Sequence, residues 1–568
     1  MTKKSVVKAL ICAVISSALI VSASASANAG VCEDVPIKAV LASDHTDTYE
    51  AYMNGEIEVD ENSGVGIPPY SAKGSIIQPS GSLPPSYQTK TTPIRSQGSN
   101  NTCWAFSGLG TLEAALSHQG KGDVDLSEQH LAWWATLYYN ENDGTGWLNK
   151  SLSPGGYSKT SAGYLASWEG PKLESDLPYH GSTYPSGMKD YNTQYYVTGI
   201  KYVRNDIQSI KSAIYEYGAV ATSYNNGTGY NNNRAVYYND QEVYSFSGHA
   251  VTVIGWDDDY SMYNFNQNNL PPANGAWLAK NSWGTNVGDN GYLWISYYDK
   301  YAFSTETWGE NYAVTAVKTV TPYHKLYQNE HYGATYYAYI TDDQGNWMNN
   351  VTFANVFDFD QEHRYLESII FETKTENINY TAYYIPVENG RPVNDESQWT
   401  FLTTGTADGS GYVRIEPDER FDLPVGVGAI GVKLDAPYAG GYSAIGVDEW
   451  LTKKDGDYLF RPDPKKGDSF VIANAKVYDL LDVYAANNDD VGGTLVIKAV
   501  AATNIIGDVD FDSKSTSADS LRVLRKTVGL EDFDEEQEID ADVNFDGNID
   551  TLDALMILRK TVGIFEEY

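Results

Sequence analysis

Residues 97–107 read QGSNNTCWAFS, and this stretch decides how the first half of the chain is interpreted. From Trp104 to Leu116, apolar residues recur every three or four positions, which predicts a helix that begins close to Cys103. A thiol at the N-terminus of a helix lies near the positive end of the helix dipole, which favours the thiolate form. Cys103 is therefore a candidate nucleophile.

A nucleophilic thiol needs a base, and the candidates in this part of the chain are His118, His130, His180 and His249. The first two lie in predicted helices and the third in a loop. His249 follows Ser247-Gly248 and precedes a β-run, so we expect it at a strand start, where its ring is held rigidly enough for proton transfer. Asn281 ends another predicted strand and is placed to orient the His249 ring.

The pattern around these residues changes from helical to extended. Further helices are expected after Ser127 and over 208–217, and strands at 250–256, 276–280 and 291–296. Helices first and strands later indicate an α+β domain.

Residues 318–502 show no convincing helical pattern. Short apolar-alternating runs recur between turns, at 334–340, 365–371, 380–385, 427–434, 470–475 and 493–500. Such regular short strands predict an all-β sandwich.

The end of the chain contains an internal repeat, because LRKTVGL at 524–530 recurs as LRKTVGI at 558–564. Each copy follows a loop with acidic or other oxygen-bearing side chains at the positions that bind calcium. These ligand positions are Asp508, Asp510, Asp512, Thr516 and Asp519 in the first loop, and Asp542, Asn544, Asp546, Asp550 and Asp553 in the second.

Calcium is a hard cation that takes six to eight oxygen ligands, so the two loops predict two structural Ca²⁺ ions. Gly547 fills the sharp-turn position of the second loop, whereas Ser513 stands there in the first. We expect an exiting helix after each loop and no entering helix before either.

The chain has 568 residues and a net charge of -36, with 75 acidic and 39 basic residues. This excess argues against nucleic acid as a partner, which requires a basic surface, and against anionic membranes.

The N-terminus has the pattern of a secretory signal peptide. Three lysines precede the apolar run 9–21, and the small-residue stretch after it ends at Ala29. The run is too short for a confident membrane span. The chain has only three cysteines, Cys12, Cys32 and Cys103. We therefore expect that this exported protein is not stabilised by a framework of disulfides.

Six fragments in the first half resemble the papain (C1) family of cysteine proteases. They are Gln97-Gly98, Cys103-Trp104-Ala105-Phe106, Leu126-Ser127-Glu128-Gln129, Gly155-Gly156, Gly248-His249-Ala250-Val251 and Asn281-Ser282-Trp283-Gly284. One departure is Asn100, which stands where the family usually has a disulfide cysteine.

The resemblance implies a role for each matching residue. Cys103 would be the nucleophile, His249 the general base and acid, and Asn281 the residue that orients His249. The Gln97 side chain and the Cys103 N–H would form the oxyanion hole. Gly155 and Gly156 would pair with the substrate backbone, and Trp283 would shield the His249–Asn281 contact.

Two further resemblances concern the rest of the chain. Residues 504–566 resemble the dockerin module, which implies docking onto a cohesin module through positions such as Ser517, Ala518, Thr551 and Leu552. Residues 318–502 resemble the lectin-like β-sandwich of some bacterial C1 proteases. Sugar binding is implied by that name only, and a purely structural sandwich is the alternative.

The sequence thus predicts a multidomain protein with five parts. These are a signal peptide (1–29), a pro-segment or loosely ordered N-terminal region (30–82), a papain-like α+β domain (83–317), a lectin-like all-β sandwich (318–502) and a small all-α calcium-binding dockerin (503–568).

The predicted function is a secreted cysteine endopeptidase anchored to a cohesin-bearing scaffold, in a cell-surface or cellulosome-type complex. Its partners would be a protein or peptide substrate, the cohesin and, through the sandwich, a carbohydrate. It would use no cofactor for catalysis and would not insert into a membrane. One alternative is an exopeptidase, amidase or transferase with the same acyl-enzyme. The other is a non-catalytic or weakly catalytic binding component of the same assembly.

Overall fold

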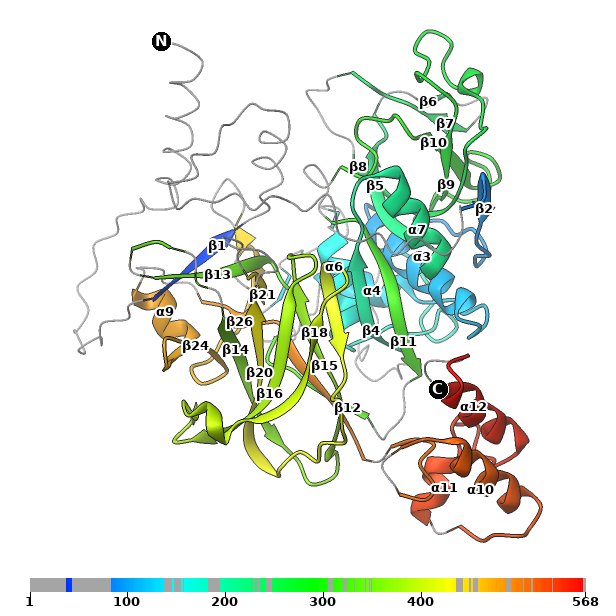
Figure 1. The fold of residues 1–568 in the computed structure, drawn as a ribbon. Coiled ribbons are helices and arrows are strands. Elements are labelled where there is room, and N and C mark those ends of the chain that lie inside the picture. Colours follow the sequence, from blue (N-terminus) through cyan, green and yellow to red (C-terminus); the bar gives the residue numbers. More distant parts are fainter. Residues whose placement is uncertain are drawn as a thin grey trace.

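The structure is a computed structural model, and it describes most of the chain from Leu83 onward (Figure 1). The described residues are 37–42, 83–136, 146–147, 155–156, 158–181, 195–227, 230–231, 235–241, 248–304, 310–319, 324–330, 332–342, 344–346, 348, 350–435, 443–448, 451–452, 458–486, 492–503, 505–511, 514–533 and 535–564. The signal peptide expected at 1–29 lies outside them. Within the described part of the chain, no helix is long and apolar enough to cross a membrane.

The α+β domain has four helices among its described residues. They are α3 (Cys103–His118), α4 (Glu128–Thr136), α6 (Ser158–Ala166) and α7 (Ile207–Tyr217). Helices α3, α4 and α7 confirm the three that periodicity predicts, whereas α6 was not predicted. Helix α3 is buried from Trp104 to Leu116, which makes it the central helix of this domain.

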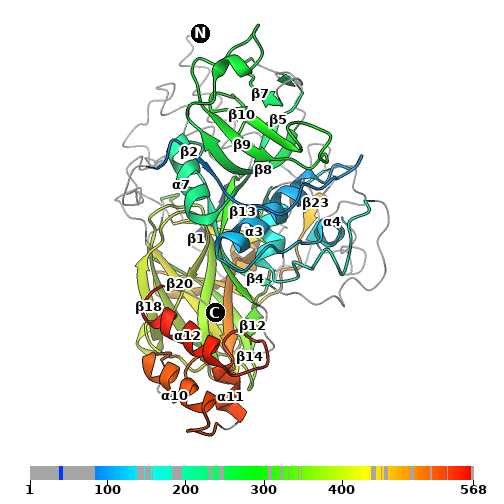
Figure 2. The same cartoon turned by 90° about the vertical axis from the view of Figure 1, so that its right-hand side faces the viewer.

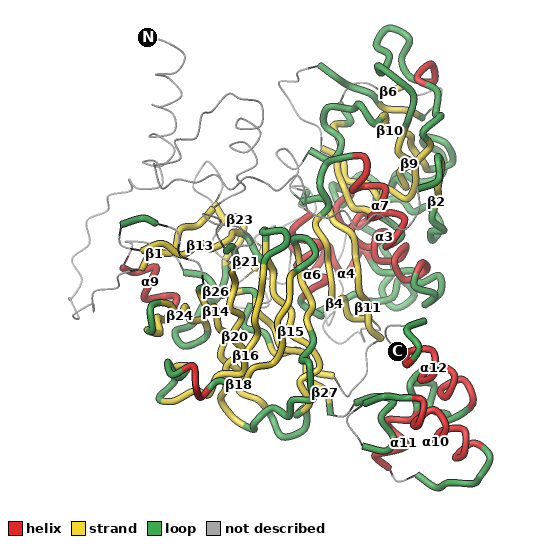
Figure 3. The backbone as a smooth tube through the Cα atoms, in the orientation of Figure 1, coloured by secondary structure: helices red, strands yellow, loops and turns green. Residues whose placement is uncertain are grey.

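The strands expected at 250–256, 276–280 and 291–296 are formed, together with others that the sequence did not predict, and the α+β expectation is confirmed (Figure 3). They are β2 (Ser86–Gln88), β4 (Tyr195–Tyr202), β5 (Val220–Asn225), β6 (Tyr230–Asn231), β7 (Val236–Tyr237), β8 (Gly248–Asp257), β9 (Ala276–Lys280), β10 (Tyr292–Ser296) and β11 (Tyr312–Thr319), with a 3₁₀ turn, η3 (Met262–Asn264).

The second domain consists of strands, as expected. They are β12 (His324–Tyr327), β13 (Tyr336–Asp342), β14 (Val351–Phe359), β15 (Tyr365–Thr373), β16 (Asn379–Glu388), β17 (Arg391–Pro392), β18 (Thr400–Thr406), β19 (Gly411–Ile415), β20 (Gly426–Asp435), β21 (Ile445–Asp448), β22 (Leu451–Thr452), β23 (Tyr458–Arg461), β24 (Ser469–Ala473), β25 (Lys476–Asp479), β26 (Thr494–Leu495) and β27 (Ile497–Ala502), with a 3₁₀ turn, η4 (Glu396–Gln398).

One expectation about this domain is wrong, because it contains helix α9 (Leu480–Ala486). Leu480, Val483 and Tyr484 are buried on one face of α9. Seven residues span only two turns, which is too short for the helical period to stand out from the strand pattern around it.

The two domains share one β-sheet. Among the described residues it has thirteen strands in the order β12-β27-β15-β19-β4-β11-β5-β8-β9-β10-β7-β6, with β2 paired to β8. The junction is an antiparallel pairing of β19 with β4, in which Gly411 lies opposite Lys201 and Tyr412 opposite Ile200. Figure 2 shows β4 beside the strands of the second domain.

The sandwich is completed by a seven-stranded sheet, β17-β16-β20-β14-β24-β25 with β18 paired to β16. Its core draws side chains from both sheets, such as Phe353 on β14 and Ile430 on β20 from one, and Phe371 on β15 and Ile497 on β27 from the other. All four are fully buried.

Two small sheets link segments that are distant in sequence. Strand β1 (Ile37–Ala42) leads the order β1-β13-β21-β26, and β3 (Gly146–Trp147) pairs with β23. The sequence led us to expect residues 30–82 to be loosely ordered or a pro-segment. Within that range, residues 37–42 form a strand, and its partner strand lies about 300 residues further along the chain.

The C-terminal domain has three helices among its described residues, α10 (Ser517–Thr527), α11 (Glu535–Ala541) and α12 (Thr551–Thr561). The exiting helices are confirmed. The expectation that no helix enters either loop is wrong for the second loop, because α11 ends immediately before Asp542. Its sequence, EEQEIDA, is mostly acidic, and only Ile539 and Ala541 pack into the small core, so no apolar period announces it.

The sheet junction makes a testable prediction at Gly411. This residue has φ +121°, and a Cβ here would lie 2.2 Å from the carbonyl oxygen of Ile200. We expect Gly411→Ala to lower the free energy of unfolding by about 2–4 kcal/mol, because backbone strain and a clash with the ladder add together. Thermal unfolding measures the loss. The matched control is Gly390→Ala, which has φ +74° but meets no atom within 4 Å, and should cost about 1 kcal/mol. Equal losses would contradict the prediction.

Candidate active site and calcium loops

Helix α3 and strand β8 bring Cys103 and His249 together. Cys103 is the first residue of α3, and α3 packs directly against β8, whose second residue is His249. The backbone N–H of Ala250, the next residue on β8, is close enough to the Cys103 thiol to lower its pKa. The thiol therefore lies against the start of the strand that carries the expected base.

The His249 ring is held by two neighbours from the segment after β9. Its Nε2 donates to Oδ1 of Asn281 at 2.7 Å, and Oδ1 also accepts the backbone N–H of Ser282 at 2.8 Å. Since Nε2 carries the proton in this contact, Nδ1 is the nitrogen left to take a proton from the thiol. The Trp283 ring stacks on His249, with ring centroids 4.2 Å apart.

Gln97 is joined to the same segment by a second set of hydrogen bonds. Ser282 donates from Oγ to Oε1 of Gln97 at 2.6 Å, and the Gln97 backbone N–H donates to the Ser282 carbonyl at 2.8 Å. Nε2 of Gln97 donates to the carbonyl of Asn100 at 2.6 Å. An amide nitrogen has two hydrogens, so the second remains for an oxyanion. The sequence holds Ser282 within a motif fragment and gives no local signal for this bond to Gln97, which lies 185 positions away.

Asn100, which stands where the family it resembles usually has a disulfide cysteine, bonds to a loop about 80 residues further along the chain. Its Nδ2 donates to the carbonyl of Gly181 at 2.5 Å and contacts the Tyr179 hydroxyl at 3.4 Å. Tyr179 in turn bonds Oγ1 of Thr102 at 2.8 Å and the carbonyl of Gln97 at 3.1 Å. These bonds clamp the loop between Gln97 and Cys103. The role of Tyr179 carries no sequence signal, because it lies in a loop outside every motif.

Gly155 and Gly156 lie beside the helix that starts at Cys103. A Cβ on Gly156 would lie 2.5 Å from the Trp104 ring, so only glycine allows the backbone to approach this closely. Gly155 has φ +80° and lies next to Asn101. The structure thus brings all seven predicted site residues of this domain into one neighbourhood.

A buried ion pair connects α3, which starts at Cys103, with β9, which ends just before Asn281. Lys280, the last residue of β9, contacts Glu113 of α3 at 3.2 Å, and both side chains are more than 90% buried. Lys280 also donates to the Thr92 hydroxyl at 2.6 Å. Removing one partner of a buried pair leaves an uncompensated charge, so the pair fixes the distance between α3 and β9.

Burial favours the neutral form of both titratable groups of the site, so it shifts their pKa values in opposite directions. It raises the pKa of the Cys103 thiol, an effect that the N–H groups of Ala250 and Trp104 oppose. It lowers the pKa of His249 to about 4, against the opposing effect of the bond to Asn281. At pH values above the titration of His249 and below that of the thiol, the two groups together hold one proton, and both pKa shifts favour the neutral thiol with the neutral imidazole.

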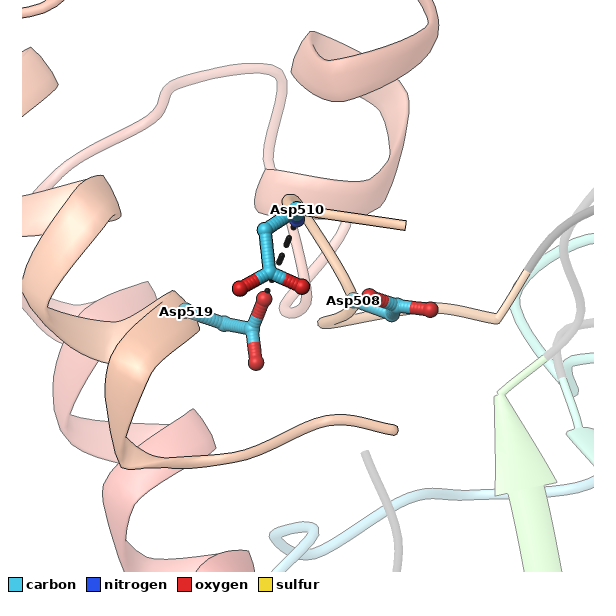
Figure 4. Close-up of side chains that lie close together, drawn as sticks. All are labelled: Asp508, Asp510 and Asp519. Atoms are coloured by element: carbon cyan, nitrogen blue, oxygen red, sulfur yellow. Dashed lines mark hydrogen bonds between the residues drawn. The ribbon is translucent and has the colours of Figure 1, made fainter. Parts of the chain in front are cut away.

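The first calcium loop gathers the expected carboxylates. Asp508, Asp510 and Asp519 have oxygens within 4.8 Å of one another, as Figure 4 shows. Oδ1 of Asp519 accepts the backbone N–H groups of Val509 and Asp510 at 2.9 and 3.2 Å, which pins α10 to the loop. Three carboxylates this close repel one another, and a hard divalent cation with oxygen ligands fits them. Asp512 lies outside the described residues.

Thr516, another expected ligand, is the N-cap of α10. Its hydroxyl accepts the backbone N–H of Ala518 at 3.1 Å and donates to Oδ2 of Asp519 at 3.0 Å. This threonine therefore shapes the loop as well as offering it an oxygen.

The second loop has the same helix cap and backbone hydrogen bonds as the first, but its acidic side chains are arranged differently. Asp550 caps α12, and Asp553 accepts the N–H groups of Asn544 and Asp550 at 3.3 and 2.8 Å. Asp542 accepts those of Asp546 and Gly547 at 3.1 and 2.9 Å. In the described part of the chain, only the first loop gathers three acidic side chains within 4.8 Å.

Comparison with known families matches three parts of the chain. A family model described as papain family cysteine protease matches residues 84–311, one described as lectin like domain matches 326–501, and one described as dockerin type I domain matches 506–560.

Solved structures match the first two parts together. The cysteine protease and lectin-like domains of Cwp84, a surface layer associated protein of Clostridium difficile, are 34% identical, with a TM-score of 0.67 over 83% of this chain and 99% of that one. Clostridial Cwp84 after propeptide cleavage is 37% identical, with a TM-score of 0.64 over 73% and 97%.

Curated relatives match a shorter share of the chain. A cysteine protease of Blomia tropicalis is 29% identical over 40% of this chain and 65% of the relative. A viral cathepsin of Heliothis zea nuclear polyhedrosis virus is 31% identical over 36% and 49%. The chain spans between about half and two thirds of the length of these relatives.

The shared proton predicts how the thiol reacts with iodoacetamide as pH changes. Below about pH 4, the His249 imidazole is protonated on both ring nitrogens and cannot accept the proton of Cys103, so alkylation should slow. Above that pH we expect a plateau, because the one-proton pair includes a thiolate–imidazolium form. In His249→Ala the plateau should vanish, leaving a rate that rises only as the half-buried Cys103 thiol, whose pKa is raised, ionises. Labelling followed by mass spectrometry measures both profiles. A wild-type rate without the plateau would contradict the assignment.

Proposed function

This chain belongs to the papain family of cysteine proteases, and from that premise we propose that it is an endopeptidase with Cys103 as its nucleophile. The observation that carries the proposal is the unbroken chain of contacts from His249 through Asn281 and Ser282 to Gln97, with the Cys103 thiol against the start of β8. It supplies a nucleophile, an oriented base and an oxyanion donor in one place.

The reaction follows from these positions. Nδ1 of His249 takes the thiol proton, and the sulfur attacks the carbonyl carbon of the peptide bond. The oxygen becomes an oxyanion that accepts the Cys103 N–H and the second N–H of Gln97. His249 then gives its proton to the leaving amine, which leaves a thioester. Water, deprotonated by His249, attacks the thioester and releases the acid and the thiol.

The residues around this centre have supporting roles. We assign Gly155 and Gly156 to backbone pairing with an extended substrate, since the close packing on Trp104 leaves no side chain in the way. Trp283 covers the His249–Asn281 bond and keeps water from it. Asn281 keeps the ring in the tautomer that the first step needs.

The C-terminal domain is proposed as a calcium-dependent dockerin that binds a cohesin module. Its exposed apolar side chains lie at equivalent positions of the two repeats, each 40–67% exposed. They are Leu521 and Leu524 on α10 with Val528 just after it, and Leu555 and Leu558 on α12 with Val562 just after it. An apolar stripe of this size facing solvent marks a protein interface. Ca²⁺ in the two loops would hold both helices in place.

We also propose an extracellular location, in a cell-surface or scaffold-bound complex, and removal of an N-terminal segment during maturation. The relative Cwp84 is described as surface layer associated and is known after propeptide cleavage. The boundaries 29, 82, 317 and 502 remain our proposed limits of the parts. The lectin-like domain is assigned a structural role through the shared sheet, and no residue is assigned to a sugar.

Hydrolysis of an internally quenched peptide with both ends blocked tests the endopeptidase. The wild-type chain, freed of its N-terminal segment and kept reduced at about pH 6–7, should cleave it. Cys103→Ala should lower kcat/KM by about a thousand-fold or more, because the nucleophile and its base act as a unit. An exopeptidase would leave the blocked peptide intact. If neither protein cleaves any peptide and a thiol-directed epoxide fails to label Cys103, the binding-component alternative replaces the proposal.

Docking is tested by capture of the chain on a panel of immobilised cohesins. Chelating calcium should abolish capture, and adding Ca²⁺ should restore it. Mg²⁺ should not restore capture, because it demands a tighter octahedral site. Leu521→Asp combined with Leu555→Asp should weaken capture at least about tenfold, because both stripes then carry a charge that must be desolvated. The control is Val427→Asp, an equally exposed apolar residue on the second domain. Capture by the same cohesin that survives the chelator would contradict the calcium role.

A further inference from the structure

We propose that the edge of β13 is a strand-docking site, filled in the precursor by residues 37–42, and that cleavage between 43 and 82 turns this tethered contact into an exchangeable one. Six residues of β1 pair antiparallel with β13, from Ile37 opposite Asp342 to Ala42 opposite Tyr337. The occupant of the site is therefore a segment of this same chain.

Strand β13 offers a free edge only when β1 is absent. On its other side β13 pairs with β21, and β1 is the outermost strand of this sheet. Five of the seven β13 residues are buried, so an unpaired β13 would expose backbone donors and acceptors beside an apolar surface. Such an edge is a ready template for another extended strand.

Ile37 anchors the strand in the core of the second domain. Its side chain is fully buried and belongs to the same apolar cluster as Ile340 of β13 and Val483 of α9. Helix α9 packs against β1, and Figure 1 shows the two side by side at the end of the domain. The next residue, Lys38, is exposed, as alternation along a strand requires. The site thus combines backbone pairing with an apolar environment that favours an aliphatic side chain at position 37.

The order of segments along the chain makes this contact unusual. β1 precedes the α+β domain but pairs within the second domain, and residues 43–82 connect it to Leu83. In the uncut chain this connection holds the strand at a high effective concentration near β13. A single cut in the connection removes that advantage, because rebinding becomes bimolecular. The same six residues are then held only by the intrinsic affinity of a short strand.

The inference rests on the proposed maturation, but an engineered cut tests it separately. A recognition sequence for a site-specific protease is inserted between Ser63 and Gly64 of the full chain, in a Cys103→Ala background that cannot cut itself. A fluorescent peptide of residues 33–46 is then added to intact and cut protein, and its binding is followed by anisotropy. We expect binding to the cut protein and at least about tenfold weaker binding to the intact one, where the tethered strand competes.

Two peptide variants identify the contact. Ile37→Asp should reduce binding to the cut protein at least about tenfold, since a carboxylate would enter an apolar environment. Lys38→Asp, which changes the charge more but faces solvent, should bind within about threefold of the original. The proposal is overturned if the peptide binds intact and cut proteins equally, if it binds neither, or if both variants bind alike. Because Cys103 is absent throughout, failure here leaves the proposed peptidase activity untouched.

Discussion

The backbone ladder between β4 and β19 is the constraint on which the arrangement of the two large domains depends. It continues the sheet of the α+β domain into the sandwich, so the domains cannot tilt without breaking main-chain hydrogen bonds. Buried polar contacts surround it. Lys498 contacts Glu330 at 2.7 Å with both side chains fully buried, and it also donates to the carbonyl of Ala166 on α6. A domain movement that separated Lys498 from these partners would leave a buried charge unpaired, which costs about 3–5 kcal/mol in measured cases.

This rigidity matters for the active site because its parts come from separate elements. Cys103 starts α3, His249 starts β8, and the segment holding Asn281 and Ser282 follows β9. The Lys280–Glu113 pair and the hydrogen bonds of Ser282 hold these elements in register. Catalysis by proton transfer depends on distances of this kind, so the scaffold sets the chemistry as much as the nucleophile does.

The C-terminal domain follows a different logic. Its core is small, with Val509, Val523, Val543 and Ile557 among its buried members, while the most apolar stripes of α10 and α12 face solvent. In an isolated protein the arrangement would be inverted, because apolar side chains favour the core. It is consistent with a domain that leaves its apolar helix faces to a partner and depends on calcium to organise its loops. The proposed strand exchange at β13 is a second contact of the chain that changes with its processing state.

The sequence by itself determined what is local. The helix at Cys103, the strands around His249 and Asn281, the calcium loops and the order of the three domains follow from periodicity and from residues a few positions apart. Only the tertiary structure decided the long-range pairings. The Asn100–Gly181 bond, the Ser282–Gln97 bond across 185 positions, the β1–β13 strand pair and the β4–β19 junction join segments with no shared local pattern. Strand pairing through the backbone and single side-chain hydrogen bonds cannot be recognised in the sequence, because many different residues can make them equally well. Helices α9 and α11 were missed for a related reason, since two turns carry too little periodicity to be recognised.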